Sequence, residues 1–193
     1  MLMGVRISQE GCFVIKALML GAGHTPLERK LSVTEEPVDR WISLDMNEDA
    51  KPDILFSLNL IEQGCKIPNE AGYDLAGEIF DEIHAYDVIE HYGQQGDYKG
   101  FFRGFKELWR ILKPGGMLYG ICPKYSSDWA WGDPGHTRVI TQGTLCYLTR
   151  QMYKDLGDAP QTDYRRFVDP CWWIVAVTKE TEYGLQFALR KDK

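Results

Sequence analysis

The chain has 193 residues with 22 Lys+Arg against 28 Asp+Glu, so its formal net charge is −6. This length and a hydrophobic fraction of 44% suit one globular domain with a buried core, and they exclude a disordered chain. The acidic balance argues against tight non-specific binding to nucleic acid, which needs a basic face, and no apolar run is long enough for a transmembrane helix.

Apolar runs separated by turns predict the first four strands. Residues 15–20 form a run that ends at Gly21-Ala22-Gly23, which predicts a buried strand followed by a tight turn. Residues 41–44 predict a second strand, closed by Asp45, and residues 54–60 form a third apolar segment. In residues 78–88 acidic residues give way to apolar ones, which predicts a fourth strand.

The clearest helix comes next. Between Tyr98 and Leu112, apolar residues recur at spacings of three and four, which predicts a helix with one broad apolar stripe. Asp97 is the predicted N-cap, and Pro114-Gly115-Gly116 is predicted to stop the helix. Residues 117–122 predict a fifth strand. Such alternation is typical of a parallel sheet with helices on its faces.

The C-terminal part breaks this alternation. Residues 171–178 and 183–190 predict two strands with only the four polar residues 179–182 between them. Four residues can close a hairpin but cannot hold a crossover helix, so these strands must run antiparallel. A parallel sheet that finishes in an antiparallel hairpin is a restrictive topology.

Five cysteines, at positions 12, 65, 122, 146 and 171, are spread over the chain. No pair has the two-residue spacing of a zinc knuckle or a redox motif. We therefore expect no metal site, and buried thiols in a protein of the reducing cytoplasm. No signal peptide is expected, because Lys16 interrupts the N-terminal apolar run and no small-residue cleavage site follows.

The glycine turn offers backbone amides at the carboxyl edge of the sheet, where a ligand can approach closely. The dinucleotide fingerprint needs a third glycine, and Pro26 stands at that position, which disfavours a nicotinamide-dependent oxidoreductase. Asp45 ends the next strand, 22 residues after Gly23. An acid there accepts two ribose hydroxyl bonds, although Asp45 could instead cap the turn at residues 45–47.

Five segments of the sequence resemble those of a known family. These segments are KALMLGAG (16–23), WISLDMN (41–47), KPDI (51–54), DEIHAYDVIEH (81–91) and FKELWRILKPGG (105–116). In them the chain resembles the class I S-adenosylmethionine-dependent methyltransferases, and most of all the small type-11-like group. The resemblance implies one domain over residues 1–193 with a Rossmann-like α/β fold. This fold is a three-layer sandwich around a mostly parallel seven-stranded sheet with a C-terminal antiparallel hairpin.

The resemblance implies S-adenosylmethionine (SAM) as cofactor and a small-molecule or sugar-like methyl acceptor. The cofactor-binding positions that it implies are Gly21, Ala22, Gly23, Asp45, Met46, Ser57, Tyr86 and Val88. The glycine turn would pack against the methionyl part, Asp45 would hold the ribose, and Met46 would cover the adenine. Ser57 stands where the family often places an acid near the adenine amino group. Tyr86 and Val88, with Asp87 between them, would lie beside the methyl group.

Methyl transfer needs alignment, and it needs a base only where the acceptor must lose a proton. The candidate catalytic residues are Asp87, His91 and His136, and each histidine could equally fix a loop by hydrogen bonding. The aromatic segment 125–131, with Trp129 and Trp131, would either wall the acceptor pocket or anchor its loop in the core.

Two departures from the family pattern keep an alternative open. Residues 24–38 contain two prolines and no helical stripe, so the first helix is predicted to be short or irregular. The glycine pattern is also reduced, which leaves a non-catalytic binding or partner module of the same fold as the alternative function. No nucleic-acid partner is expected, because Asn/Asp-Pro-Pro-Tyr/Phe and Pro-Cys are both absent after the fourth strand, although modification of a ribose or a tRNA edge stays open. No membrane partner is expected, because no apolar run is long enough to span a bilayer.

Overall fold

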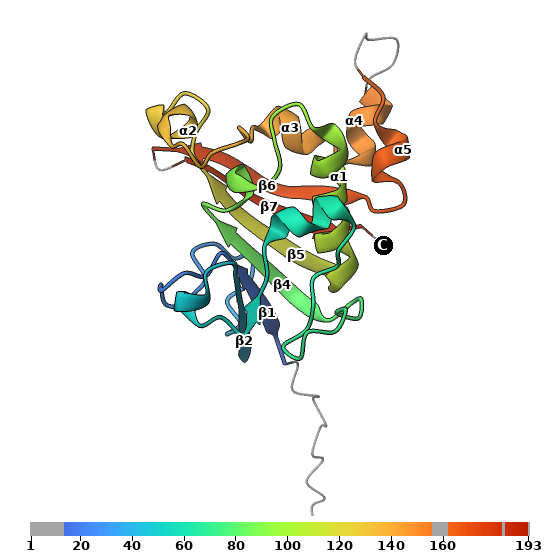
Figure 1. Ribbon diagram of the computed structural model, residues 1–193. Helices are drawn as coiled ribbons and strands as arrows, with labels where there is room; N and C mark the ends of the chain where they lie inside the picture. The colour runs from blue at the N-terminus through green and yellow to red at the C-terminus, as the bar shows by residue number, and fades with distance from the viewer. Residues whose placement is uncertain (1–13, 156–161, 183, 193) are drawn as a thin grey trace, which may run out of the picture.

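The computed structural model describes residues 14–155, 162–182 and 184–192, and in this part of the chain seven strands form one sheet (Figure 1). They are β1 (Lys16–Leu20), β2 (Arg40–Asp45), β3 (Ile54–Leu55), β4 (Phe80–Tyr86), β5 (Leu112–Cys122), β6 (Trp173–Thr181) and β7 (Gly184–Lys191). The sheet order is β3-β2-β1-β4-β5-β7-β6. Strands β1 to β5 pair in parallel, whereas β7 runs antiparallel to both β5 and β6. The predicted mixed sheet with its terminal hairpin is confirmed.

The longest helix of the described residues is α1 (Tyr98–Ile111), and Asp97 caps it by accepting a hydrogen bond from the Gly100 amide at 3.0 Å. The other helices are α2 (Asp128–Gly132), α3 (Gln142–Cys146), α4 (Arg150–Asp155) and α5 (Arg165–Val168), and the 3-10 turns are η1 (Glu48–Ala50), η2 (Leu58–Gln63) and η3 (Ile89–His91). The predicted helix and its cap are confirmed.

The stop of α1 differs from the prediction. The helix ends at Ile111 and passes directly into β5, because the residue before a proline avoids the helical region. Phe80 of β4 pairs with Leu112, and Glu82 pairs with Met117. Residues 113–116 therefore form a bulge within β5 instead of a turn between the helix and the strand.

The third strand and the hairpin also differ from their predicted bounds. The strand β3 pairs only with the last two residues of β2, and the apolar residues that follow it turn into η2. There Leu58, Leu60 and Ile61 pack into the core that α1 also enters. At the other end of the sheet, β6 continues to Thr181 and β7 begins at Gly184, so the hairpin connection is shorter than the four residues predicted.

The two faces of the sheet are covered differently. On one face, strand residues such as Leu18, Ile83 and Phe187 are fully buried in a cluster to which α1, α3, α4, α5 and η2 contribute side chains. The cluster on the other face consists of Met19, Ala22, Tyr86, Met117, Tyr119 and Ala188, packed with partly buried residues that include Leu27 and Leu31. No helix of the described residues contributes to this second cluster. The irregular segment 24–38 thus takes the place of the helix that the fold class implied, as the two prolines indicated.

A buried polar network holds this segment on the sheet. Arg29 forms an ion pair with Glu82 at 2.6 Å, and Glu82 also contacts His84 Nε2 at 2.9 Å. Burial would raise the pKa of Glu82, but the hydrogen bonds from His84 and Arg29 outweigh it and lower this pKa. The Tyr86 hydroxyl accepts hydrogen bonds from the amides of Lys30 and Leu31 at 3.1 and 3.3 Å.

The structure also bears on two further expectations, which concern membrane-spanning helices and the burial of the cysteines. Across residues 14–155, 162–182 and 184–192, no helix combines the length and apolarity needed to cross a membrane. Of the cysteines in that part of the chain, Cys122 is buried, Cys146 and Cys171 are half-buried, Cys65 is exposed, and all four are free thiols. The expectation of buried thiols is wrong for Cys65, which follows the exposed end of η2, and Cys12 lies outside the described residues.

Candidate functional site

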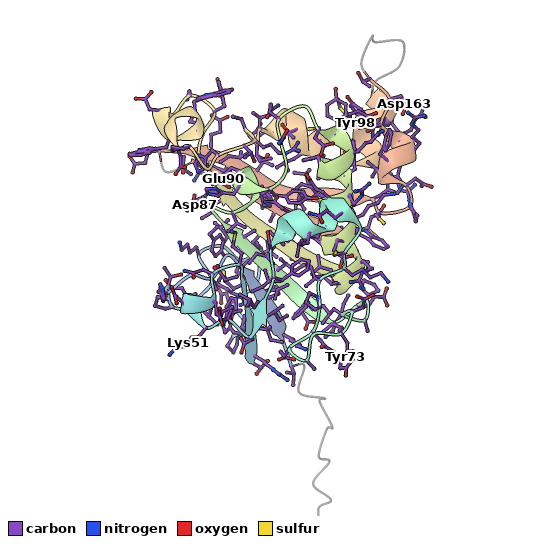
Figure 2. All side chains as sticks on the ribbon, in the orientation of Figure 1. Lys51, Tyr73, Asp87, Glu90, Tyr98 and Asp163 are labelled. Carbon is purple, nitrogen blue, oxygen red and sulfur yellow. The ribbon has the colours of Figure 1, made fainter. Side chains whose placement is uncertain are left out.

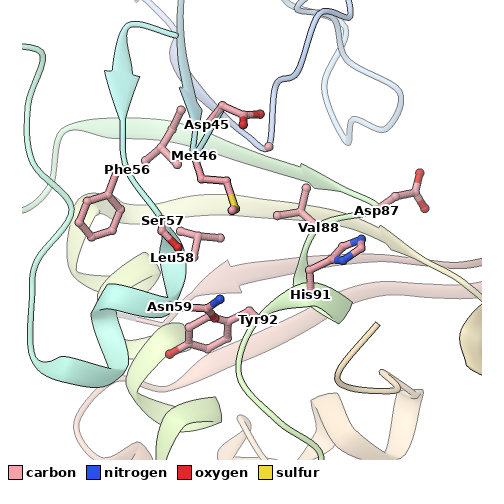
Figure 3. Close-up of a pocket in the computed structure, with 12 residues that line it drawn as sticks. Asp45, Met46, Phe56, Ser57, Leu58, Asn59, Asp87, Val88, His91 and Tyr92 are labelled. Carbon is pink, nitrogen blue, oxygen red and sulfur yellow. The ribbon is translucent and has the colours of Figure 1, made fainter. Parts of the chain in front are cut away.

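A cavity of about 180 Å³ opens at the carboxyl ends of β1, β2 and β4 (Figure 3). Seven of the predicted site residues line it, and they are Gly21, Asp45, Met46, Ser57, Asp87, Val88 and His91. Sequence reasoning missed four of the residues that complete the lining, and they are Phe56, Leu58, Asn59 and Tyr92. Phe56 and Leu58 flank Ser57, Asn59 follows Leu58, and Tyr92 follows His91. The predicted strand ends therefore located the cavity but not all of its lining.

Asp45 is the buried acid of this cavity, with 8% of its surface exposed. Its Oδ2 accepts a hydrogen bond from the Gly23 amide at 2.7 Å, and its Oδ1 accepts one from the Asn47 amide at 2.8 Å. The carboxylate therefore caps the turn at residues 45–47 and also fixes the glycine turn. Each carboxylate oxygen has two lone-pair sites, so both can accept a further hydrogen bond from a ligand.

The two glycines of the turn differ in their surroundings. Gly21 has a φ of +59°, and a Cβ atom there would lie 2.4 Å from Val88 Cγ2, so only glycine lets the ends of β1 and β4 approach this closely. Gly23 has a φ of +52°, and no heavy atom of the described residues lies within 4 Å of its Cβ position. The backbone at Gly23 is thus open to a ligand, whereas the space above Gly21 is occupied by Val88.

Two predicted cofactor positions place their side chains on the opposite face of the sheet. Ala22 belongs to the second core cluster with 4% exposure. The Tyr86 hydroxyl lies 2.6 Å from His84 Nδ1 and binds the segment 24–38, and burial raises the pKa of this phenol. Both residues support the strand ends that carry the site, without lining the cavity.

Asp87 follows β4 with a φ of +56°, a left-handed conformation that is uncommon for a residue other than glycine. Its amide donates to the Ile121 carbonyl at 2.8 Å, which holds this backbone beside the end of β5. Figure 2 shows Asp87 and Glu90 close together at the end of β4. Strained backbone of this kind costs about 1–3 kcal/mol and concentrates at functional sites.

Next to the cavity, His91 and His136 meet with ring centroids 4.6 Å apart. His91 Nδ1 lies 2.9 Å from the Gly135 carbonyl oxygen, and His136 Nδ1 lies 2.7 Å from the Trp129 carbonyl oxygen. Glu90, which the sequence analysis did not single out, is 2% exposed beside them, and burial raises the pKa of its carboxyl. No local pattern in the sequence marks Glu90, because its burial depends on the docking of residues 133–138.

The aromatic loop after β5 lies at the surface. Tyr125, Trp129 and Trp131 are 53%, 73% and 69% exposed, so the interpretation of these rings as core anchors is wrong. The Trp131 indole donates to the Tyr125 carbonyl at 2.7 Å, which closes the loop on itself. A wall of the acceptor site remains the prediction for these rings, which are outside the lining of the cavity.

No protein-family model matches this sequence, and no curated protein matches it either. Among solved structures, the N-methyltransferase NodS from Bradyrhizobium japonicum WM9 in complex with S-adenosyl-L-homocysteine (SAH) is similar with a TM-score of 0.53 and 13% identity, over 93% of this chain and 79% of that one. The complex between the Haloferax volcanii Trm112 methyltransferase activator and the methyltransferase paired with it contains a chain with a TM-score of 0.51 and 12% identity, over 92% of this chain and 82% of that one.

This chain has the methyltransferase fold. The similarity extends over 93% of the chain, and the sheet ends in the antiparallel hairpin that the sequence predicted independently of the family motifs. In this methyltransferase fold the cavity lies outside the carboxyl ends of the parallel strands, where ligands of open α/β sheets bind.

Proposed function

We propose that this protein is a SAM-dependent methyltransferase that acts on a small-molecule or sugar-like acceptor in the reducing cytoplasm. One observation carries the proposal: the cavity of this methyltransferase fold is lined by the buried Asp45 carboxylate, whose two oxygens each keep an acceptor position. The open backbone at Gly23 adjoins this carboxylate, so a ligand with hydroxyl groups fits the acceptors and the space present.

The proposed cofactor positions divide along the cavity. Asp45 would accept the ribose hydroxyls, and Met46 would cover the adenine opposite Leu58, toward which its side chain extends in Figure 3. Ser57 would accept or donate one neutral hydrogen bond near the base, and the Gly23 backbone would face the methionyl part. When bound, SAM supplies a methyl group on a sulfonium, which a nucleophile displaces in line.

At the other end of the cavity, Asp87 and His91 are the polar groups that would face the acceptor. Because their Nδ1 atoms face carbonyl oxygens, His91 and His136 each donate from Nδ1, so Nε2 is the ring nitrogen that would face an acceptor. As a general base, either Nε2 would take a proton from an acceptor hydroxyl. The exposed rings of Trp129 and Trp131 are placed to stack on a sugar or planar acceptor.

A thermal-shift experiment tests this proposal. A ligand that binds only the native state must stabilise it, so SAH should raise the melting temperature, and NAD at the same concentration should leave it unchanged. Absence of a shift with millimolar SAH would instead support the non-catalytic binding module. A shift with NAD alone would support a nicotinamide site, although Pro26 replaces the third glycine of the dinucleotide fingerprint.

A further inference from the structure

We propose that Glu90, His91 and His136 form a binding site for a divalent first-row transition metal ion. One ligand atom from each side chain lies within 4.8 Å of the other two. The three residues come from η3 and from the loop after α2, which are separated by more than 40 residues in the sequence. This inference contradicts the expectation of no metal site, which considered only the spacing of cysteines.

Both histidines have the hydrogen bonding that a metal ligand requires. A carbonyl oxygen can only accept, so Nδ1 of His91 and Nδ1 of His136 must carry the proton that they donate to Gly135 and Trp129. The Nε2 atoms are then the ring nitrogens that would bind the metal. His136 Nε2 also lies 3.8 Å from Asp133 Oδ2, so this half-exposed carboxylate is a neighbour of the proposed site. Histidines that ligate metals commonly donate the other ring N–H to a backbone carbonyl in this way, which fixes both the tautomer and the ring orientation.

Glu90 supplies an independent observation. Its side chain is 2% exposed, and neither carboxylate oxygen has a hydrogen-bond partner among the described residues. The buried Cys122 thiol, which is a weak donor, lies beside it, and the Asp87 carboxylate and the His91 ring are its charged or titratable neighbours. Buried carboxylates are normally paired or bind metals, so this carboxylate beside two imidazoles lacks a cation.

Backbone contacts hold the two parts of the cluster together. The Glu90 carbonyl accepts hydrogen bonds from the amides of Thr137 and Arg138 at 2.9 and 3.0 Å. The buried Arg138 guanidinium donates to the carbonyls of Gln94 and Asp97 at 2.7 and 3.0 Å. The juxtaposition of His136 with Glu90 and His91 is therefore fixed by the fold and does not depend on a bound ion.

The donor set indicates the class of metal. Two imidazoles and one carboxylate suit Zn²⁺ and its first-row neighbours better than Mg²⁺ or Ca²⁺, which prefer oxygen ligands. Bonds of about 2.1 Å would require the three atoms to approach by roughly 1 Å, within the reach of side-chain rotation. Three protein ligands leave a position open, and His91 also lines the cavity, so an oxygen of the acceptor could complete the coordination. That last role rests on the proposed function, whereas metal binding does not.

Metal binding is tested on the full chain after removal of metals with a chelator. Titration calorimetry should show one Zn²⁺ bound per chain, and Co²⁺ should give a visible absorption band without thiolate-to-cobalt absorption. Glu90→Gln, His91→Asn and His136→Asn should each weaken Zn²⁺ binding by more than the roughly 10- to 100-fold that loss of a supporting residue costs. Zn²⁺ should raise the melting temperature of the unmodified protein but not that of Glu90→Gln.

Two control variants separate this site from general metal binding. His24→Asn removes an exposed histidine, and Glu62→Gln removes another carboxylate with an unpartnered oxygen. Both variants should bind Zn²⁺ as tightly as the unmodified protein does. Glu90→Gln without metal should melt no lower than the unmodified protein, because the amide has nearly the shape of the carboxyl and no hydrogen bond to either carboxyl oxygen is lost. Absence of Zn²⁺ binding, thiolate absorption, or binding that survives all three site substitutions would overturn the proposal. The response to SAH in the metal-free protein is a separate readout, so a failure of either proposal is distinguishable.

Discussion

Asp45 combines a structural and a proposed functional role in one carboxylate. It accepts hydrogen bonds from the amides of Gly23 and Asn47, so it fixes the glycine turn at the same time as it lines the cavity. From the sequence, a ribose contact and a cap of the turn at residues 45–47 were alternatives for Asp45. The geometry makes the two roles compatible, because each carboxylate oxygen has a second lone pair.

Asp45→Asn tests the ribose contact with little change in shape. A hydrogen bond to a charged acceptor contributes about 1.5–3 kcal/mol, so SAH should bind about 10- to 100-fold more weakly, as measured by titration calorimetry. Asp53→Asn is the matched control, because Asp53 accepts from Ser43 at 2.7 Å and does not line the cavity. Unchanged SAH affinity in Asp45→Asn would show that the ribose lies elsewhere.

Gly21→Ala tests the close approach of β1 and β4. The added Cβ would meet Val88 Cγ2 at 2.4 Å in a left-handed conformation, so the free energy of unfolding should fall by about 1–3 kcal/mol in urea titrations. Gly21→Ala/Val88→Ala removes the overlap and should be less destabilised than the sum of the two single changes. Strict additivity of the two changes would contradict the contact with Val88.

At the scale of residues, prediction from sequence found the strand-end positions and missed those that depend on packing. Asp45, Met46 and Val88 directly follow or end apolar strands, so they could be placed. Glu90 could not be identified, because its burial and its lack of partners appear only when residues 133–138 dock on η3. Ala22 and Tyr86 were predicted as site residues because each is next to one in the sequence, but their side chains lie in the core cluster on the other face of the sheet.

At the scale of elements, the segment 24–38 shows how a sheet face can be covered without a helix. Its contact with β4 depends on Arg29 and Glu82, whose side chains are 14% and 5% exposed. Removing one partner of such a buried pair leaves an uncompensated charge. Arg29→Met should therefore lower the free energy of unfolding by about 3–5 kcal/mol, and Arg29→Met/Glu82→Gln should recover part of that loss.

The same pair predicts an acid dependence of stability. The pKa of Glu82 is lowered in the fold from its ordinary value of 4.5, so its contribution is fully present above pH 4.5 and is lost as the pH falls through the folded pKa. The free energy of unfolding of the unmodified protein should thus fall more steeply below pH 4.5 than that of Arg29→Met/Glu82→Gln. Parallel pH profiles for the two proteins would contradict the ion pair.

Local sequence patterns predicted most elements because each pattern has a simple physical basis. The apolar stripe and the Asp97 cap placed α1, and the short connection made β6 and β7 antiparallel. The η2 turn escaped prediction because an apolar run of this length fits a buried strand equally well. The bulge at residues 113–116 escaped because its cause is the pairing of β5 with β4, which lies outside the local sequence.

At the scale of the whole molecule, the order of the strands brings the chemistry together. The ends of β1, β2 and β4 are adjacent in the sheet although they are far apart in the sequence (Figure 1). The cavity lies where these ends meet. The hairpin β6–β7 adds the antiparallel edge beside β5 that completes the methyltransferase fold. His91 belongs to the proposed metal cluster and also lines the cavity at the carboxyl ends of the parallel strands. A cofactor in the cavity and an acceptor beside the cluster would therefore share one opening.

The measurement that tests the central claim most directly is a crystal structure of the full chain grown with millimolar SAH. The account predicts density for the nucleoside in the cavity between Asp45, Met46 and Leu58, with the ribose hydroxyls on the Asp45 carboxylate. Well-ordered crystals whose cavity stays free of SAH, or a nucleoside bound away from the end of β2, would contradict it.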